Sequence, residues 1–558
     1  MSRRESWLSA AVIFVVAIAV RAAAAAAVSF PVPEDTAYYA GVARNLVEGR
    51  GLISDALWSY QTQPLVLPRA AFEVWLPLPS LLAAVPVALA GAANWFRAAQ
   101  IVSVLASSAV AVMAWRLAAD LAAELRLPVG RARSMGIGTG LAATVMGPLV
   151  LYGALPDSTA LFAAFSLAAC LLMTRIAAAE DPGDASGATD PAARRPIPFD
   201  RRLLALGLLL GAAALTRSEA VWLALAWVAV VWFWTPGSRR RRIGLIAAPG
   251  VVAFLVFAPW AVRDWLVFGN PLPGQAISNA LYAHSYDVFA YQDPPTLAGY
   301  LGQGPGALAS QHLAGLEHDI FSVLLLPGIP VSLLGLIALP WLGRRPSLRP
   351  LVLVSIFTFL ATSLLFPVAT QSGTYLHAAG SAPVLLAVCA VAGLDRLIVW
   401  VGRLRHWTRP VAWLGPAFAI ATIAPLCLLT VVSISRSADD ARHLYEALPA
   451  AMARAGAPLD GAAPVITDNP IWLTEATRVP ALALPEESPD AVLALARRFG
   501  AGLLIVRTDG DREWPDVLNR GGTAAKCFQE VLLADNTGSK PADGSPLARI
   551  RVFRIACP

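Results

Sequence analysis

Long apolar runs separated by short polar segments make up most of the 558-residue chain. The first run, residues 7–29, is long enough to cross a bilayer and contains one charged residue, Arg21. Further spans are predicted over residues 95–115, 134–153, 158–178, 203–216, 220–235, 243–262, 320–342, 350–368, 379–400 and 411–433. These later spans favour an uncleaved anchor over the alternative for the first run, a secretory signal peptide. The pattern predicts a polytopic α-helical membrane protein with about eleven transmembrane helices.

Residues 75–90 form an apolar run that we do not expect to cross the membrane. This run is short and contains three prolines, which disfavour a continuous transmembrane helix. As an outer juxtamembrane or re-entrant helix, it leaves every basic loop cluster on the inner side, as the positive-inside rule requires. These clusters contain Arg126, Arg131 and Arg133; Arg194, Arg195, Arg201 and Arg202; Arg239, Arg240, Arg241 and Arg242; Arg344, Arg345 and Arg349; and Arg403, Arg405 and Arg409.

Composition agrees with this class of protein. Hydrophobic residues make up 57% of the chain, charged residues 14%, and the mean hydropathy is +0.60, which excludes an ordinary soluble domain. The formal net charge of +6 comes from arginines in short loops rather than from one continuous basic surface. We therefore expect a lipid bilayer, and no nucleic acid, as the chain's environment. A cell (inner or plasma) membrane is the expected location.

The composition becomes that of a soluble domain near residue 435. Strands are predicted over residues 464–467, 481–484, 502–506, 528–533 and 549–553, and an amphipathic helix over residues 489–499. We expect a transmembrane domain over residues 1–434 and a small extracytoplasmic α/β domain over residues 435–558. If this domain lies in an oxidising compartment, Cys527 and Cys557 could form a disulfide.

Two adjacent carboxylates, Glu34 and Asp35, follow the first span at the start of a long outer loop, residues 31–94. Apolar and aromatic residues, Tyr38 and Tyr39 among them, then recur at helical spacing, so residues 36–48 read as an amphipathic interfacial helix capped by Thr36. Partial desolvation would raise a carboxylate pKa and suit one acid to general base catalysis. The alternative is that both acids are ordinary solvated loop residues.

Other polar residues fall near the same predicted face of the membrane. Asp157 follows a proline between two spans and is either a helix cap or a functional carboxylate. Arg217 lies between two short apolar runs, where it either binds an anion or pairs with Glu219. A second long outer loop, residues 263–319, begins at Arg263, and Tyr375 and His377 lie in a later outer turn.

Several of these segments, in this order, resemble the C-type (GT-C) membrane glycosyltransferases. The segments are the acids and aromatics after the first span, WLPLPS, the PDS turn, LGLLLGAAALTRSEA and PWAVRDWLVFGNPLP. The likeness covers roughly residues 1–400 and points to the glycosyltransferase family 39-like group of protein O-mannosyltransferases and lipid A aminoarabinose transferases. The acid pair of that family is Asp then Glu, whereas here it is Glu34 then Asp35. The family often has Asn where this chain has Asp264.

The resemblance implies inverting transfer of a sugar from a polyprenyl-phosphate donor to an extracytoplasmic protein, lipid or glycan acceptor. Within that frame, we expect Asp35 or Glu34 to act as base and Asp157 as an acceptor or second-carboxylate site. The expected phosphate-binding residues are Arg217, Arg263, His377 and Arg21, although Arg21 could instead snorkel to the interface. The expected acceptor-cleft residues are Tyr38, Tyr39, Glu73 and Tyr375.

The carboxylates could also hold a divalent cation, but no ligand spacing in the sequence indicates one. Two other classes of function remain open at this point. A secondary transporter would also bury ions within its spans, but it usually has paired inverted halves, which this sequence lacks. A non-catalytic lipid-binding scaffold would use the arginines and leave the adjacent acids without a role.

Overall fold

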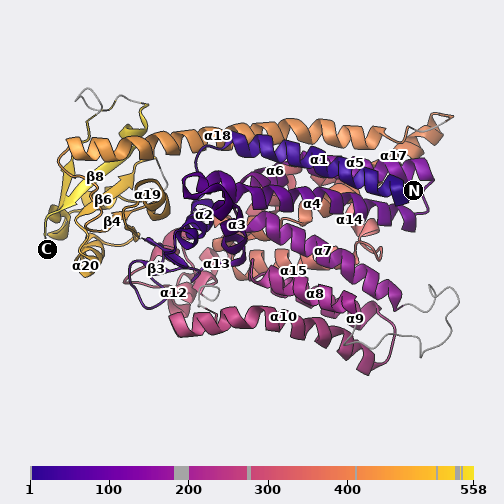
Figure 1. The fold of residues 1–558 in the computed structure, drawn as a ribbon, viewed down its shortest axis with the longest axis horizontal. Coiled ribbons are helices and arrows are strands. Elements are labelled where there is room, and N and C mark those ends of the chain that lie inside the picture. Colours follow the sequence, from indigo (N-terminus) through magenta and orange to yellow (C-terminus); the bar gives the residue numbers. More distant parts are fainter. Residues whose placement is uncertain are drawn as a thin grey trace.

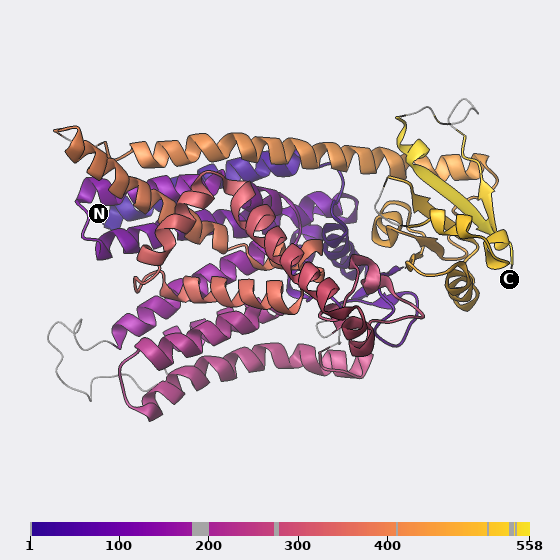
Figure 2. The same cartoon turned by 180° about the vertical axis from the view of Figure 1, so that it is seen from behind.

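The computed structural model describes residues 3–180, 200–272, 278–408, 411–509, 513–534, 541 and 544–557. Three arginines of the predicted basic clusters, Arg194, Arg195 and Arg409, lie outside the described residues. The molecule is elongated: most helices run side by side along its length, and the strands gather at one end (Figure 1). The view from behind shows the same arrangement (Figure 2).

Within the described ranges, six helices are long and apolar enough to cross a membrane. They are α1 (Arg3–Ala27), α4 (Trp95–Glu124, preceded by η1, Ala92–Asn94), α7 (Ser158–Ala179), α10 (Arg239–Phe268), α17 (Ala382–Leu404) and α18 (Leu414–Arg454). Two bent pairs raise the number to eight. They are α5 (Val129–Thr144) with α6 (Gly147–Ala154), bent by 51°, and Gly304–Gly328 with α14 (Val331–Leu342), bent by 112°.

Shorter helices complete the bundle and its loop-bearing end. α3 (Leu78–Ala90), α9 (Ala220–Trp234) and α15 (Arg349–Leu365) are apolar, and α8 (Arg201–Ala214) has 14 residues. α3 lies where the short proline-rich run predicted a juxtamembrane helix. The remaining loop elements are α2 (Glu34–Val47), β1 (Ile53–Ser54), β3 (Arg69–Ala70), η5 (Ser285–Phe289), α12 (Leu297–Gly302), α13 (Gly304–Glu317), η6 (His318–Leu325), η7 (Leu326–Gly328), η8 (Ala369–Ser372) and α16 (Thr374–Ala378).

Small residues allow close helix packing in the bundle. Gly207 and Gly211, one turn apart on α8, face α10 so closely that a Cβ on Gly207 would lie 2.8 Å from the carbonyl oxygen of Pro249. A Cβ on Gly211 would lie 2.6 Å from the Cβ of Val256. Small residues at this spacing let two helix backbones approach when both are in a membrane.

Arg21 connects three helices inside the bundle. Its side chain is fully buried, and its Nε donates to the Oγ of Ser107 on α4 at 2.7 Å. Its Nη1 and Nη2 donate to the carbonyl oxygens of Thr144 and Ala143 on α5, each at 3.2 Å. The guanidinium therefore bonds to neighbouring helices and does not snorkel to the membrane surface.

A six-stranded sheet with the order β2-β5-β4-β6-β8-β7 lies at the end of the molecule where the chain finishes. Its strands are β2 (Ala56–Leu57), β4 (Val465–Thr467), β5 (Ala481–Ala483), β6 (Leu503–Arg507), β7 (Phe528–Val531) and β8 (Ile550–Ile555). The first four in spatial order are parallel, and β8 pairs antiparallel with both β6 and β7. All five predicted strands are present, and the predicted helix is α20 (Pro489–Phe499).

The sheet is not built by the C-terminal residues alone. Its edge strand β2 comes from the first outer loop, with Ala56 opposite Ala481. Helix α19 (Pro470–Thr477) was not predicted, and three short helices, η9 (Asp516–Arg520), η10 (Ala524–Cys527) and η11 (Pro546–Arg549), border the sheet. α18 continues through residue 435 to Arg454, so the domain division at that residue remains a prediction.

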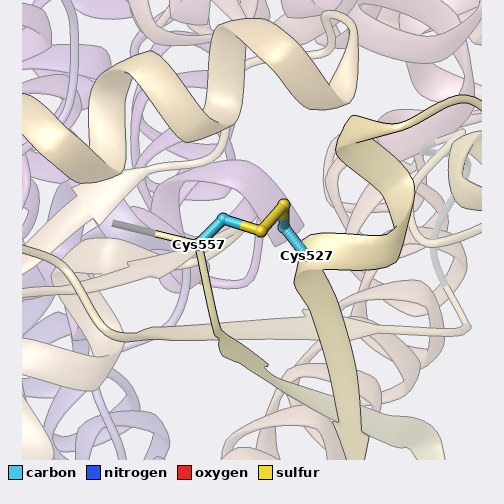
Figure 3. The surroundings of a disulfide bond; sticks show 2 residues. All are labelled: Cys527 and Cys557. Atoms are coloured by element: carbon cyan, nitrogen blue, oxygen red, sulfur yellow. A yellow bond between two sulfur atoms is a disulfide. The ribbon is translucent and has the colours of Figure 1, made fainter.

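Contacts from the second long outer loop also reach the C-terminal segment. Glu487 accepts hydrogen bonds from the backbone N–H groups of Tyr291 at 2.7 Å and Gln292 at 2.9 Å. Val288 and Phe289 share a buried apolar cluster with residues of the sheet. The disulfide between Cys527 and Cys557 is present and joins the start of β7 to the chain just after β8 (Figure 3).

The contact between α8 and α10 leads to a first prediction. Gly211→Ala should lower the free energy of unfolding by about 1–3 kcal/mol, because the new Cβ must push Val256 and the two helices apart. The matched control is Gly250→Ala in α10, where an added Cβ meets no atom within 4 Å and alanine is the better helix former. Thermal unfolding in lipid nanodiscs measures both. Equal unfolding temperatures for the two variants would contradict the close packing.

Candidate active site

The two acids of the first outer loop begin helix α2. Its N-cap is Pro33, so Thr36 lies inside the first turn and the predicted Thr36 cap is wrong. The acids occupy that turn instead, where the positive end of the helix dipole favours negative charge. The ten residues Thr36–Asn45 are all buried within the protein, and the location of this helix at the membrane interface stays a prediction. α3 packs against Ala40 and Ala43, and α19 covers the side of α2 that carries Arg44.

Three residues far apart in the sequence meet at this end of the bundle. Asp35 at the start of α2, Asp157 before α7 and His377 on α16 offer ligand atoms that all lie within 4.8 Å of one another. The Nε2 atom of His377 lies 3.6 Å from the Oδ2 of Asp35, and its Nδ1 lies 3.5 Å from the Oδ1 of Asp157. His377 therefore lies between the two carboxylates, and we call these three residues the acid–histidine cluster.

Asp157 caps α7, as one of the two predicted alternatives holds, and it is also a member of this cluster. Its Oδ1 accepts hydrogen bonds from the backbone N–H of Thr159 at 2.6 Å and from the Thr159 hydroxyl at 2.5 Å. The Thr159 hydroxyl also lies 2.7 Å from Nδ1 of His377. Oδ2 of Asp157 is buried and has no hydrogen-bond partner among the described residues, which leaves one carboxylate oxygen available within the cluster.

Burial and neighbouring charges shift the pKa values of the three groups differently. Burial acts against ionisation of Asp157, but His377 and the Thr159 hydrogen bonds lower the pKa of Asp157 to about 2. Burial also acts against a charged His377, yet Asp157 and Asp35 raise the pKa of His377 above its ordinary value. Burial raises the pKa of Asp35, although His377 opposes the rise. Asp35 is also the most accessible member, with 28% of its side chain exposed.

Arg217 lies beside the cluster. Its Nη2 pairs with Oε1 of Glu219 at 2.7 Å, and its Nη1 donates to the Oγ of Ser158, the residue after Asp157, at 3.0 Å. Burial would lower the pKa of Arg217, but Glu219, Tyr39 and Asp157 raise it, so the guanidinium stays charged. The ion pair with Glu219 therefore forms, and the cation still lies near Asp157 and Tyr39.

A second polar group contains Tyr38, Glu73 and Arg263. Arg263 pairs with Asp264 at 2.7 Å and lies over the ring of Phe268, with 5.3 Å from guanidinium carbon to ring centroid. Arg69 lies over the same ring, with 5.2 Å from guanidinium carbon to ring centroid. It also pairs with Glu73, so the negative charge of this buried carboxylate is already compensated. The hydroxyl of Tyr38 accepts a hydrogen bond from the backbone N–H of Phe72 at 2.6 Å.

Three other predicted site residues face elsewhere. Tyr375 is buried against Phe359, with ring centroids 5.6 Å apart, and lies in an apolar cluster rather than in a cleft. The donors of Arg21 bond within the helix bundle, as described above. Glu34 faces α19: its Oε1 accepts hydrogen bonds from the backbone N–H groups of Ile471 at 3.0 Å and Trp472 at 3.4 Å. Burial raises the pKa of Glu34 to about 8 despite these bonds.

Sequence reasoning did not select Thr159, Ser158 or Tyr152 as site residues. The ring of Tyr152 on α6 packs against His377 with centroids 5.2 Å apart. A usable signal existed for Ser158 and Thr159, because Asp-Ser-Thr before an apolar run is a cap pattern that brings these hydroxyls to the carboxylate. Nothing in the sequence distinguishes Tyr152 from an interfacial aromatic residue.

The acid–histidine cluster also fits a divalent cation. Among the described residues it offers two carboxylates and an imidazole at mutual ligand distance, and one buried carboxylate oxygen lacks a partner. Oxygen and imidazole ligands of this kind suit Zn²⁺ and related divalent ions. The sequence spacing could not show this, because the three ligands come from three separate loops.

The fold around this cluster is that of the GT-C membrane glycosyltransferases, as the sequence resemblance predicted. The oligosaccharyltransferase of Archaeoglobus fulgidus in its apo form superposes with a TM-score of 0.52 and 12% identity, covering 97% of this chain and 74% of that one. ArnT from Cupriavidus metallidurans, bound to undecaprenyl phosphate, superposes with a TM-score of 0.52 and 14% identity, covering 98% and 99%. No family model and no curated sequence matches the chain.

The environment of Glu34 predicts a pH dependence of stability. The folded protein keeps a proton on Glu34 up to about pH 8, whereas an unfolded glutamate loses it near its ordinary pKa of about 4.3. This group's contribution is therefore full below pH 4 and is lost as pH rises through 8. Glu34→Gln keeps an oxygen that accepts both α19 hydrogen bonds but does not titrate, so it should flatten the unfolding temperature between pH 5 and 8. An unchanged slope would contradict this assignment.

Proposed function

We propose that the protein is an integral membrane glycosyltransferase that moves a sugar from a polyprenyl-phosphate donor to an acceptor outside the cytoplasm. The observation that carries this proposal is the acid–histidine cluster, which lies at the loop-bearing end of a GT-C fold. ArnT from Cupriavidus metallidurans has been solved with undecaprenyl phosphate, and the archaeal oligosaccharyltransferase AglB with a dolichol-phosphate and an inhibitory peptide. Those ligands support a lipid phosphate and an acceptor as the two substrates here.

Asp35 is the proposed base. It is the most exposed acid of the cluster, and burial raises its pKa above the ordinary value, which makes it a stronger base. In an inverting displacement, the acceptor oxygen bonds to the anomeric carbon and its proton passes to Asp35. The bond between that carbon and the phosphate oxygen breaks, and the electron pair leaves with the lipid phosphate.

Arg217 and His377 are the proposed partners of the departing phosphate. Arg217 is a cation in this environment, Asp157 and Asp35 raise the pKa of His377, and a planar guanidinium can donate two hydrogen bonds to phosphate oxygens. Asp157 orients His377 and favours its charged form. Arg263 and Tyr38, in the neighbouring group, are proposed to border the acceptor cleft. Cations that stabilise charge as it develops on a leaving group lower the reaction barrier directly.

A divalent cation would be held by Asp35, Asp157 and His377. When bound, it would supply Lewis-acid stabilisation of negative charge at the phosphate. The Archaeoglobus fulgidus oligosaccharyltransferase has been solved in complex with Zn and sulfate. In the present chain the fit rests on the three ligand atoms and the unpaired Oδ2 of Asp157.

We further infer that α8, α9 and α15 cross the membrane with the eight longer candidates, giving eleven spans in the cell membrane. All three lie alongside the longer helices of the bundle (Figure 1). The first outer loop, the acid–histidine cluster and the C-terminal α/β domain then share the extracytoplasmic face. The disulfide between Cys527 and Cys557 supports this sidedness, because disulfides persist in oxidising compartments.

Loss of the proposed base should abolish turnover. In nanodiscs with radiolabelled polyprenyl-phosphate sugars and pooled envelope acceptors, Asp35→Asn should lower the rate of lipid-phosphate release by about 10²–10⁴-fold. Donor binding should be retained, since the proposed phosphate contacts come from other residues. The matched control is Asp509→Asn, a partly exposed carboxylate in the C-terminal segment. Tight lipid binding without turnover in the wild type would instead favour a non-catalytic lipid-binding scaffold.

The sidedness has its own test. If the C-terminal segment is extracytoplasmic, alkylation of native membranes before lysis should leave Cys527 and Cys557 disulfide-linked in the mass spectrum of their peptides. The internal control is the buried thiols Cys170, Cys389 and Cys427, which should be recovered as free cysteines after denaturation. Alkylated Cys527 and Cys557 would place the segment in a reducing compartment.

A further inference from the structure

The acid-bearing helix α2 is held by the C-terminal segment along its whole length. At its start, Glu34 accepts the backbone N–H groups of Ile471 and Trp472 in the first turn of α19. Such first-turn N–H groups have no partner within their own helix, so a carboxyl from another element satisfies them. The next residue on α2 is Asp35.

A buried ion pair joins the last turn of α2 to α19, beside a close contact at Gly41 in the middle of α2. Glu475 on α19 pairs with Arg44 on α2, and their side chains are 7% and 4% exposed. The carboxylate of Glu475 lies directly over Gly41, where any Cβ would overlap it. Removing one partner of a buried pair leaves an uncompensated charge, so this contact tolerates little displacement.

The chain on both sides of α2 is held by the same segment. Before it, the indole Nε1 of Trp472 donates to the carbonyl oxygen of Pro31 at 2.9 Å, and Phe30 stacks on Tyr445 with centroids 5.8 Å apart. After it, Arg478 pairs with Glu48 at 2.6 Å, and strand β2 joins the edge of the C-terminal sheet. α2 is thus fixed at its start, middle and end.

The other members of the acid–histidine cluster belong to different elements. Asp157 and His377 lie at the start of α7 and on α16, which pack within the bundle. Asp35 alone comes from the helix that the C-terminal segment holds. The separation of 3.6 Å between Asp35 and His377 therefore depends on the position of α2, which α19 holds on one side while α3 packs on another.

We propose that α19 is a positioning element for the active site, and that Glu34 and Glu475 are positioning residues that hold Asp35 in register with His377 and Asp157. The kinetic effect that we expect from this inference rests on the proposed glycosyltransferase function. It gives the C-terminal segment a role in catalysis that does not require it to touch a substrate. It also gives Glu34 a role other than that of a base.

The test compares four variants in the lipid-phosphate release assay. Glu34→Ala removes the acceptor of both α19 hydrogen bonds and should lower kcat about ten- to a hundredfold, the scale expected of a misplaced catalytic group. The KM for the donor should change little. Glu34→Gln keeps an acceptor oxygen and should restore kcat with an unchanged pH profile. Gly41→Ala displaces Glu475 and should resemble Glu34→Ala, whereas Gly306→Ala in α13, where a Cβ meets nothing, should match the wild type.

Hydrogen–deuterium exchange provides a readout that does not depend on turnover. In Glu34→Ala and Gly41→Ala, amides of α2 should exchange faster while those of α7 stay unchanged. Wild-type kcat together with wild-type exchange in both variants would overturn the positioning role. A Glu34→Gln variant as inactive as Asp35→Asn would also overturn it, because it would make Glu34 the base. Absence of turnover in the wild type, with the expected exchange changes, would overturn the proposed function and leave the mechanical link intact.

Discussion

The charged pair of Asp157 and His377 is the interaction on which the rest of the site depends. A buried carboxylate is unfavourable unless its charge is compensated, and here Thr159 and the imidazole compensate it. The same pair raises the pKa of His377 and leaves its second nitrogen facing Asp35. One helix cap thus determines the protonation and orientation of the groups on which the chemistry would depend.

The neighbouring charges follow the same rule of local compensation. Three ion pairs form where the chain leaves the bundle: Arg217 with Glu219, Arg69 with Glu73, and Arg44 with Glu475. On the opposite side of the bundle, Arg131 pairs with Asp395 at 2.5 Å between α5 and α17. Pairs of this kind add little net stability over apolar packing, but each specifies which two elements must meet. Two of these pairs, Arg44 with Glu475 and Arg131 with Asp395, connect segments that are distant in sequence.

The sequence was informative wherever local physics decides the structure. Apolar length located the long helices of the bundle, alternation located the five C-terminal strands, and the helix over Pro489–Phe499 has the predicted bounds. The sequence could not show that Asp35, Asp157 and His377 converge, because convergence depends on the packing of three loops. Strand β2 has two residues and no local signature, and its place in the sheet is set by β5. Thr36 does not cap α2, because Pro33 is the N-cap and the helix already begins at Glu34.

Helix α18 imposes a geometric constraint on the contacts between the C-terminal segment and α2. It is continuous over 41 residues, so at 1.5 Å per residue it is about 60 Å long, about twice the hydrocarbon thickness of a bilayer. It runs the length of the molecule and ends at the sheet (Figure 1). Because α18 is continuous, its length determines both the distance of the sheet from the helix bundle and the rotation of the sheet about the helix axis. Insertion of a single residue would raise the sheet by about 1.5 Å and turn it by about 100°. The contacts at the C-terminal end of α18 therefore require this number of residues in the helix.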